Sequence, residues 1–114
     1  MIHSVQEAIQ RIEAIPELSG KLAYDHFTTP QQLPFAAYTY DSDTSGADDY
    51  HGVQWIDFHL ELYTEIRNFP LENALLKALS DVETTSNSDY LSDERMYMTT
   101  FNFRFPQKIS NVAT

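Results

Sequence analysis

Apolar and polar residues alternate most regularly over residues 53–64 and 95–105. In the first segment every second position is apolar (Ile56, Phe58, Leu60, Leu62), and the positions between include Trp55, His59, Glu61 and Tyr63. In the second, Tyr97, Thr99, Phe101, Phe103 and Phe105 share one side. A period of two predicts strands with one buried and one wet face. The first strand is long, so we expect it either to extend beyond its neighbours or to bend, and a strand longer than its neighbours can offer free edge groups to another subunit.

Two segments have helical spacing instead. Ser4 and Glu7 form a capping-box pattern before an apolar stripe, and Pro16 ends that helix. Pro70 suits the first turn of a second helix, with Glu72 near its N-terminus. The stripes consist of Val5, Ala8, Ile9, Ile12 and Ile15 in the first helix and Leu71, Ala74, Leu75, Ala78 and Leu79 in the second. Both helices are therefore predicted to be amphipathic.

Shorter strands are predicted at 21–27, 33–40 and 82–91, and Pro106 is expected to end the last strand. The element order is then α-β-β-β-α-β-β. Short turns between neighbouring strands indicate a mostly antiparallel sheet, and the two helices would cover one of its faces. The prediction is a two-layer α+β fold: one domain at 1–106 and a loose tail at 107–114.

The composition of the chain excludes several classes of function. The chain has 114 residues with 17 acidic and 7 basic residues, a net charge of −10. Such a chain lacks the excess of Lys and Arg that neutralises phosphates, so we expect no specific nucleic-acid binding and no attraction to an anionic membrane. Cysteine is absent, which excludes disulfides and thiolate chemistry.

The acid excess is densest at 41–52, with four acids and no base. Asp41, Asp43 and Asp49 match ligand positions of a calcium loop, but the final position is Gly52 where a bidentate Glu is needed. Strands, not helices, are predicted on both sides. We therefore interpret 41–49 as a turn-rich loop rather than a calcium site.

Other chemistry is not indicated. The four histidines form no helical ligand pair, and the chain has neither a Gly-x-Ser-x-Gly turn nor a glycine-rich phosphate loop. The aromatic stripe of 97–105 lacks the interleaved cations of a base-stacking platform, so core packing explains it better. We expect no enzymatic activity, no metal and no cofactor.

Several short motifs in one order resemble the phage tail-completion proteins of siphophages and prophages of Gram-positive bacteria, within the class of head–tail joining and tail-terminator proteins. They span residues 20–105. The motifs are Leu33-Pro34-Phe35-Ala36-Ala37-Tyr38, Ser42-Asp43, Ala47-Asp48-Asp49, Glu61-Leu62-Tyr63-Thr64, Glu72, Tyr90 and Asp93-Glu94-Arg95-Met96-Tyr97. The chain departs from the group at 64–68, where those proteins often carry a more charged segment.

The resemblance implies a non-enzymatic subunit of a ring, commonly a hexamer, assembled in the bacterial host cytoplasm and retained in the virion. Its partners would be other copies of itself, the tail-tube protein and the head–tail connector. The candidate interface or pore-lining residues are Asp41, Asp43, Asp48, Asp49, Tyr50 and Trp55. The alternative is an acidic inhibitor or DNA mimic that binds a host protein, since its net charge also fits that role.

Overall fold

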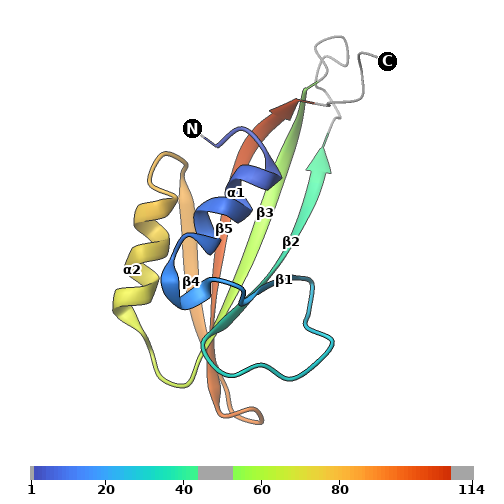
Figure 1. Cartoon of the computed structure of the whole chain (residues 1–114). Coiled ribbons are helices and arrows are strands. Elements are labelled where there is room, and N and C mark those ends of the chain that lie inside the picture. The colour runs from blue at the N-terminus through green and yellow to red at the C-terminus, as the bar shows by residue number, and fades with distance from the viewer. Residues whose placement is uncertain (1, 44–52, 109–114) are drawn as a thin grey trace.

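The computed structural model describes residues 2–43 and 53–108. Its elements, in chain order, are α1 (Val5–Glu13), the 3-10 helix η1 (Pro16–Leu18), β1 (Leu22–Tyr24), β2 (Phe35–Asp43), β3 (Val53–Thr64), α2 (Phe69–Ala78), β4 (Thr84–Leu91) and β5 (Met96–Lys108). Figure 1 shows the long strands running the length of the molecule. The predicted α+β class and the predicted order of helices and strands are confirmed.

The strands form one five-stranded sheet in the order β1-β2-β3-β5-β4. β1 runs parallel to β2, and the other neighbours are antiparallel. β3 lies in the middle, paired with β2 over Trp55–Tyr63 and with β5 over its whole length. β3 is therefore a central strand and not an edge, and in the described residues only Val53, Gln54 and Thr64 extend beyond its pairing with β2. Within the described residues, the edge strands are β1 and β4.

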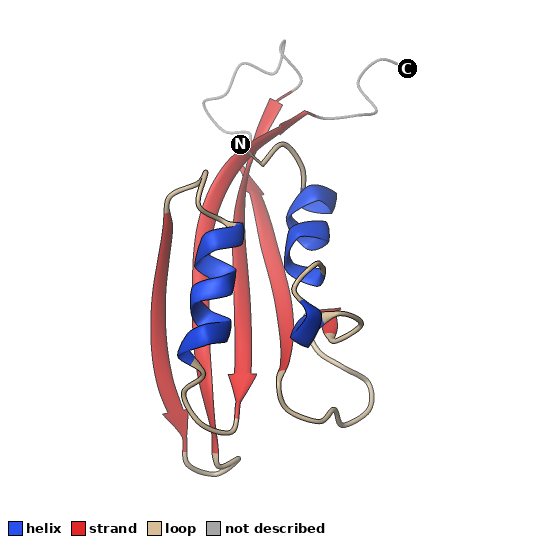
Figure 2. Cartoon of the chain, turned by 60° about the vertical axis from the view of Figure 1, so that its left-hand side comes forward, coloured by secondary structure: helices blue, strands red, loops and turns tan. Residues whose placement is uncertain are grey.

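Both helices lie on one face of the sheet, as predicted, and within the described residues no helix covers the other face (Figure 2). The Ser4 hydroxyl accepts a hydrogen bond from the Glu7 backbone N–H at 3.0 Å, which caps α1. The Glu7 carboxylate reaches back to the N–H of His3 rather than that of Ser4. α2 begins at Phe69, one residue before the predicted proline, because the Asn68 side chain accepts from the N–H of Leu71.

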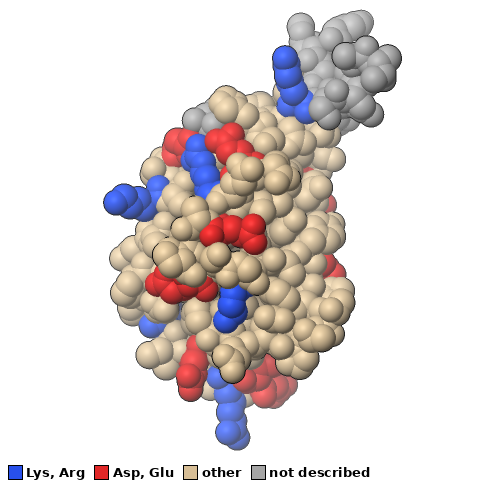
Figure 3. Space-filling view, in the orientation of Figure 1, with Lys and Arg blue, Asp and Glu red and all other residues tan. Residues whose placement is uncertain are grey.

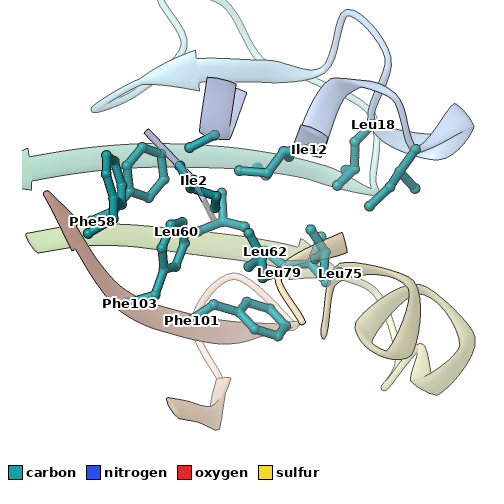
Figure 4. Close-up of a cluster of buried hydrophobic side chains, with 14 of the residues drawn as sticks. Ile2, Ile12, Leu18, Phe58, Leu60, Leu62, Leu75, Leu79, Phe101 and Phe103 are labelled. Carbon is teal, nitrogen blue, oxygen red and sulfur yellow. The ribbon is translucent and has the colours of Figure 1, made fainter. Parts of the chain in front are cut away.

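The core fills the space between helices and sheet (Figure 4). The inward positions of β3, from Ile56 to Leu62, are fully buried, as are Phe101 and Phe105 of β5. Phe58 lies at the centre, with its ring 4.8 Å from that of Phe103 and 5.3 Å from that of Tyr38. The three phenylalanines of the β5 stripe are therefore core, as the core-packing interpretation predicts, whereas Tyr97 is only partly buried and packs against Tyr90.

Three strand ends differ from the prediction. β1 stops at Tyr24, because Asp25 has a positive φ of 64° and turns the chain away. β2 continues to Asp43, so Asp41 and Asp43 lie on a strand and not in a loop. β5 continues past Pro106 to Lys108, still paired with β3. β4 pairs with β5 only as far as Phe103. Pro106 is tolerated because its missing N–H breaks no hydrogen bond to β4.

Arg11 joins the two helical segments. Its guanidinium donates to Glu7 within α1 at 2.9 Å, to the Ala78 carbonyl at 3.2 Å and to Asp81 just after α2 at 2.6 Å. The hydrogen bond from Arg11 holds the pKa of the Asp81 carboxyl well below its usual range. The ionised form of Asp81 therefore stabilises the folded state.

We expect this contact to make stability depend on acid. Because the folded pKa of Asp81 is lowered, its contribution is complete above the unfolded pKa and is lost as the pH falls toward the folded one. Denaturant titrations from neutral pH down to about pH 2 should show a shallower loss of stability for Arg11→Met than for the parent. Lys77→Met is the control, because Lys77 makes no ion pair in the described residues. If the free energy of unfolding falls equally steeply with pH in Arg11→Met and in the parent, Arg11 does not lower the pKa of Asp81.

Candidate functional site

The sheet face without helices carries the outward side chains of β3. Trp55, Asp57, His59, Glu61 and Tyr63 alternate with the buried residues of the same strand, as the period of two predicts. In the antiparallel register they lie opposite outward residues of β2 and β5. Trp55, one of the predicted site residues, therefore lies on this helix-free face.

Three of the six predicted site residues come together at one end of this face. Asp43 is the cross-strand partner of Trp55, and Asp41 is the partner of Asp57. The side chains of Asp41 and Asp43 point the same way, because they stand two residues apart on a strand. The other three, Asp48, Asp49 and Tyr50, lie outside the described residues. The first two ligand positions of the calcium-loop pattern, Asp41 and Asp43, therefore lie on strand β2.

Arg104 of β5 organises this cluster. Its guanidinium lies 3.5 Å from the Asp43 carboxylate and 3.7 Å from that of Asp57. It also stands over the Trp55 ring, 5.1 Å from the centroid. These groups are partly exposed, so each ion pair contributes little to stability. Their combined effect is to hold Trp55 in place on the surface, 39% exposed.

Sequence reasoning did not identify Arg104 as part of the site. Its place between Phe103 and Phe105 in an alternating strand does indicate an outward side chain. Which residues it meets depends on the register of β5 against β3, where Arg104 faces Asp57. That register is set by packing across the whole sheet.

A second polar group lies beside the first. His59 Nδ1 is 2.6 Å from the Asn102 side-chain oxygen, and its Nε2 is 3.5 Å from the Asp41 carboxylate. In the part of the chain that the structure describes, no three His, Asp or Glu side chains are grouped so that they could hold a metal ion. The arrangement fits recognition through hydrogen bonds and charge.

The opposite end of the helix-free face is aromatic. The Phe35 ring stacks on Tyr63 at 5.0 Å and meets the edge of Phe27 at 5.6 Å. The Tyr63 hydroxyl donates to Glu61 at 2.8 Å. Burial, followed by this carboxylate, raises the pKa of the Tyr63 phenol, so the group stays neutral across the ordinary pH range. The face therefore has one end where Arg104 lies among aspartates and another end where aromatic rings gather beside Glu61.

Comparison with known proteins gives a fold relationship. No protein-family model and no curated protein sequence matches the chain. Among solved structures, the chain is similar to one described as "Virion of native gene transfer agent (GTA) particle". The TM-score is 0.57 at 19% identity, and the match covers 85% of this chain and 88% of the other. The fold of almost the whole domain is thus one that occurs in such a virion.

No helix among the described residues is long and apolar enough to span a bilayer.

Proposed function

We propose that this chain is a structural subunit of a phage-like virion, and more specifically the tail-completion subunit that forms a ring at the head-proximal end of the tail tube. The observation that carries the proposal is the likeness in fold to a chain of a gene transfer agent virion, which covers most of both chains. The motifs at 20–105 point to the tail-completion group in particular.

The helix-free face supports a role in protein contact. Trp and Arg are enriched among residues that dominate binding energy, because each offers a large contact area and fixed hydrogen-bonding geometry. Trp55 and Arg104 stand together there, and Asp41, Asp43 and Asp57 surround them. We propose that this cluster contacts a neighbouring subunit or the tail-tube protein, and that the role is not enzymatic.

The alternative of an acidic DNA mimic has less support. A mimic needs carboxylates spread over one surface with few cations between them. On the side shown in Figure 3, acidic and basic side chains are interspersed. On the helix-free face, Arg104 stands between Asp43 and Asp57.

The test is tube capping. The chain is mixed with the tail-tube protein of its particle, and the tubes are imaged by negative stain. We expect a ring at one end of each tube. Trp55→Ala should weaken capping by about tenfold or more, with little change in the melting temperature because Trp55 is outside the core. Trp55→Phe is the matched control and should retain most of the binding.

Two results would count against the proposal. Tubes that never acquire a ring would remove the tail-completion role. Recovery of a host nuclease or polymerase on the immobilised chain, together with uncapped tubes, would favour the inhibitor. A large loss of thermal stability in Trp55→Ala would instead mark that side chain as structural.

A further inference from the structure

β4 is the longer of the two edge strands in the described sheet, with eight residues against three in β1. It pairs with β5 along its whole length without a bulge, it contains neither lysine nor proline, and its only charged residue is Asp89. Natural edge strands are usually short, bulged, charged or covered, because their unpaired backbone groups attract other strands. β4 has little of this protection, so its free edge is available for pairing.

The register of the sheet identifies the backbone groups along this edge. The N–H of Ala36 donates to the carbonyl of Lys21 on the β1 side, so the backbone groups of Ala36 point away from β3. The direction of these groups alternates along each strand, and it can be followed through the pairs from β2 to β3, β5 and β4. The β4 residues whose N–H and C=O groups then point away from β5 are Thr84, Ser86, Ser88 and Tyr90.

The middle of β4 is open on both faces. Thr85, Ser86 and Asn87 follow one another and are all exposed. Successive side chains of a strand point to opposite faces, so three exposed residues in a row mean that water reaches both sides of the strand. Figure 2 shows β4 at the left margin of the sheet, with α2 over the sheet and no helix beyond the margin. An added strand would therefore meet no helix of the described residues there.

The charges around β4 indicate the chemistry of the partner. Residues 78–94 include five acidic residues and neither lysine nor arginine. Glu83 lies at the start of β4 and Asp89 near its end, and neither forms an ion pair within the described residues. Opposite charges on neighbouring strands stabilise a pairing and like charges oppose it. A strand that carries Lys or Arg therefore fits this edge, whereas an acidic one would be repelled.

A hollow of about 200 Å³ lies beside the start of this edge. Glu83 forms part of its wall, and Asp57, His59 and Arg104 of the helix-free face form more of it. The Arg104 guanidinium already lies near the carboxylates of Asp57 and Asp43, so the Glu83 carboxylate remains available to a cation. Neighbouring strands lie about 5 Å apart, so a long basic side chain on a strand beside β4 can reach the hollow.

We propose that the free edge of β4 is a docking site for an extended, basic segment of another protein, which adds a strand to the sheet. Its backbone pairs with the outward groups of β4, one of its Lys or Arg side chains enters the hollow beside Glu83, and another meets Asp89. In strand addition the backbone hydrogen bonds provide affinity and the side-chain sites provide specificity. The proposal follows from the edge and its charges, and it does not depend on the tail-completion role.

Hydrogen exchange of the full chain, measured by NMR, tests the proposal. The probe is a synthetic peptide as long as β4, in which lysine alternates with valine. At saturation it should slow the exchange of the Ser86, Ser88 and Tyr90 amides by about tenfold or more, because these amides gain hydrogen-bond acceptors. The amides of Thr85 and Asn87 already face β5, so their exchange should change less.

Three further peptides are the controls. The first has glutamate in place of lysine and should not bind, because it repels Glu83 and Asp89. The other two keep the lysines and are methylated on the backbone nitrogens, one at every valine and one at every lysine. A strand presents alternate amides to its two edges, so one of these two peptides should lose binding and the other should retain it.

Variants of the chain test the same contact. Ser86→Pro removes an outward N–H without breaking a bond to β5, so the chain should fold and its peptide binding should weaken by about tenfold or more. Glu83→Gln should weaken binding by about two- to fivefold, the effect of one exposed ion pair. Glu17→Gln is the matched control for charge, because Glu17 lies on η1, which contacts β2 on the other side of β3.

Several results would overturn the proposal. One is the absence of added protection at the β4 amides with millimolar lysine peptide, and another is equal binding of the glutamate peptide. A folded Ser86→Pro variant that binds the peptide as the parent does would exclude the edge as the site. Protection of the same amides that rises with protein concentration, without any peptide, would also overturn the proposal, because the occupant would then be a second copy.

Discussion

Replacing Phe101 with lysine is expected to prevent the chain from folding. Phe101 is fully buried on β5, between Leu60 of β3 and Ser86 of β4 in the register. A lysine there would place an ammonium group among apolar side chains, at a cost of several kcal/mol. Because a domain of this size is stable by only about 5–15 kcal/mol, the folded state would be lost or barely populated.

The matched change is Thr100→Lys, one residue away. Thr100 lies on the helix-free face opposite Glu61, so a lysine there stays in water beside a carboxylate. Circular dichroism and thermal melts should show a folded Thr100→Lys protein and an unfolded or aggregated Phe101→Lys protein. The reverse result would mean that the two faces of β5 have been exchanged.

The sequence predicts the two layers well because each layer leaves a local periodic signal. Ile56 to Leu62 and Phe101 to Phe105 turn inward as the period of two indicates, and the stripes of α1 and α2 reach the core at Ile12 and Leu75. Hydrophobic burial drives these placements residue by residue. The same alternation predicts that Trp55 lies on the opposite face, and this prediction does not depend on which residues lie next to it.

What the sequence does not reveal is the pairing between distant segments. β1 runs parallel to β2, and Arg104 meets Asp43, a residue 61 positions earlier in the chain. Such contacts depend on which register lets all strands bury their apolar faces at once. Pro106 shows the same limit, since its effect on the strand depends on how far β4 extends beside it.

Thr64, the last residue of β3, illustrates a different limit. Alternation places Thr64 on the inward face after Leu62, and the structure confirms that it is buried. Its hydroxyl has no hydrogen-bond partner among the described residues. Whether a buried hydroxyl finds a partner depends on tertiary packing and cannot be read from the local sequence pattern.

Replacing Phe58 with alanine is expected to cause the largest loss of stability among simple truncations. Phe58 is fully buried on the central strand, and its ring contacts those of Tyr38, Tyr40, Phe103 and Phe105. Truncation removes the buried ring and leaves a cavity that strands on both sides prevent from closing. Phe→Ala changes at such sites cost about 3–5 kcal/mol. The melting temperature should fall by more than about 10 °C.

Phe58→Leu separates lost volume from lost aromatic contact. Leucine retains most of the apolar surface, so we expect it to cost clearly less than alanine. Tyr40→Ala is the second comparison: its ring also stacks on Phe58, at 6.4 Å, but it is 38% exposed and should cost less than either core truncation. Urea titrations give the three free energies on one scale. A Phe58→Ala variant as stable as Tyr40→Ala would show that the aromatic stack between β2, β3 and β5 is not the centre of the core.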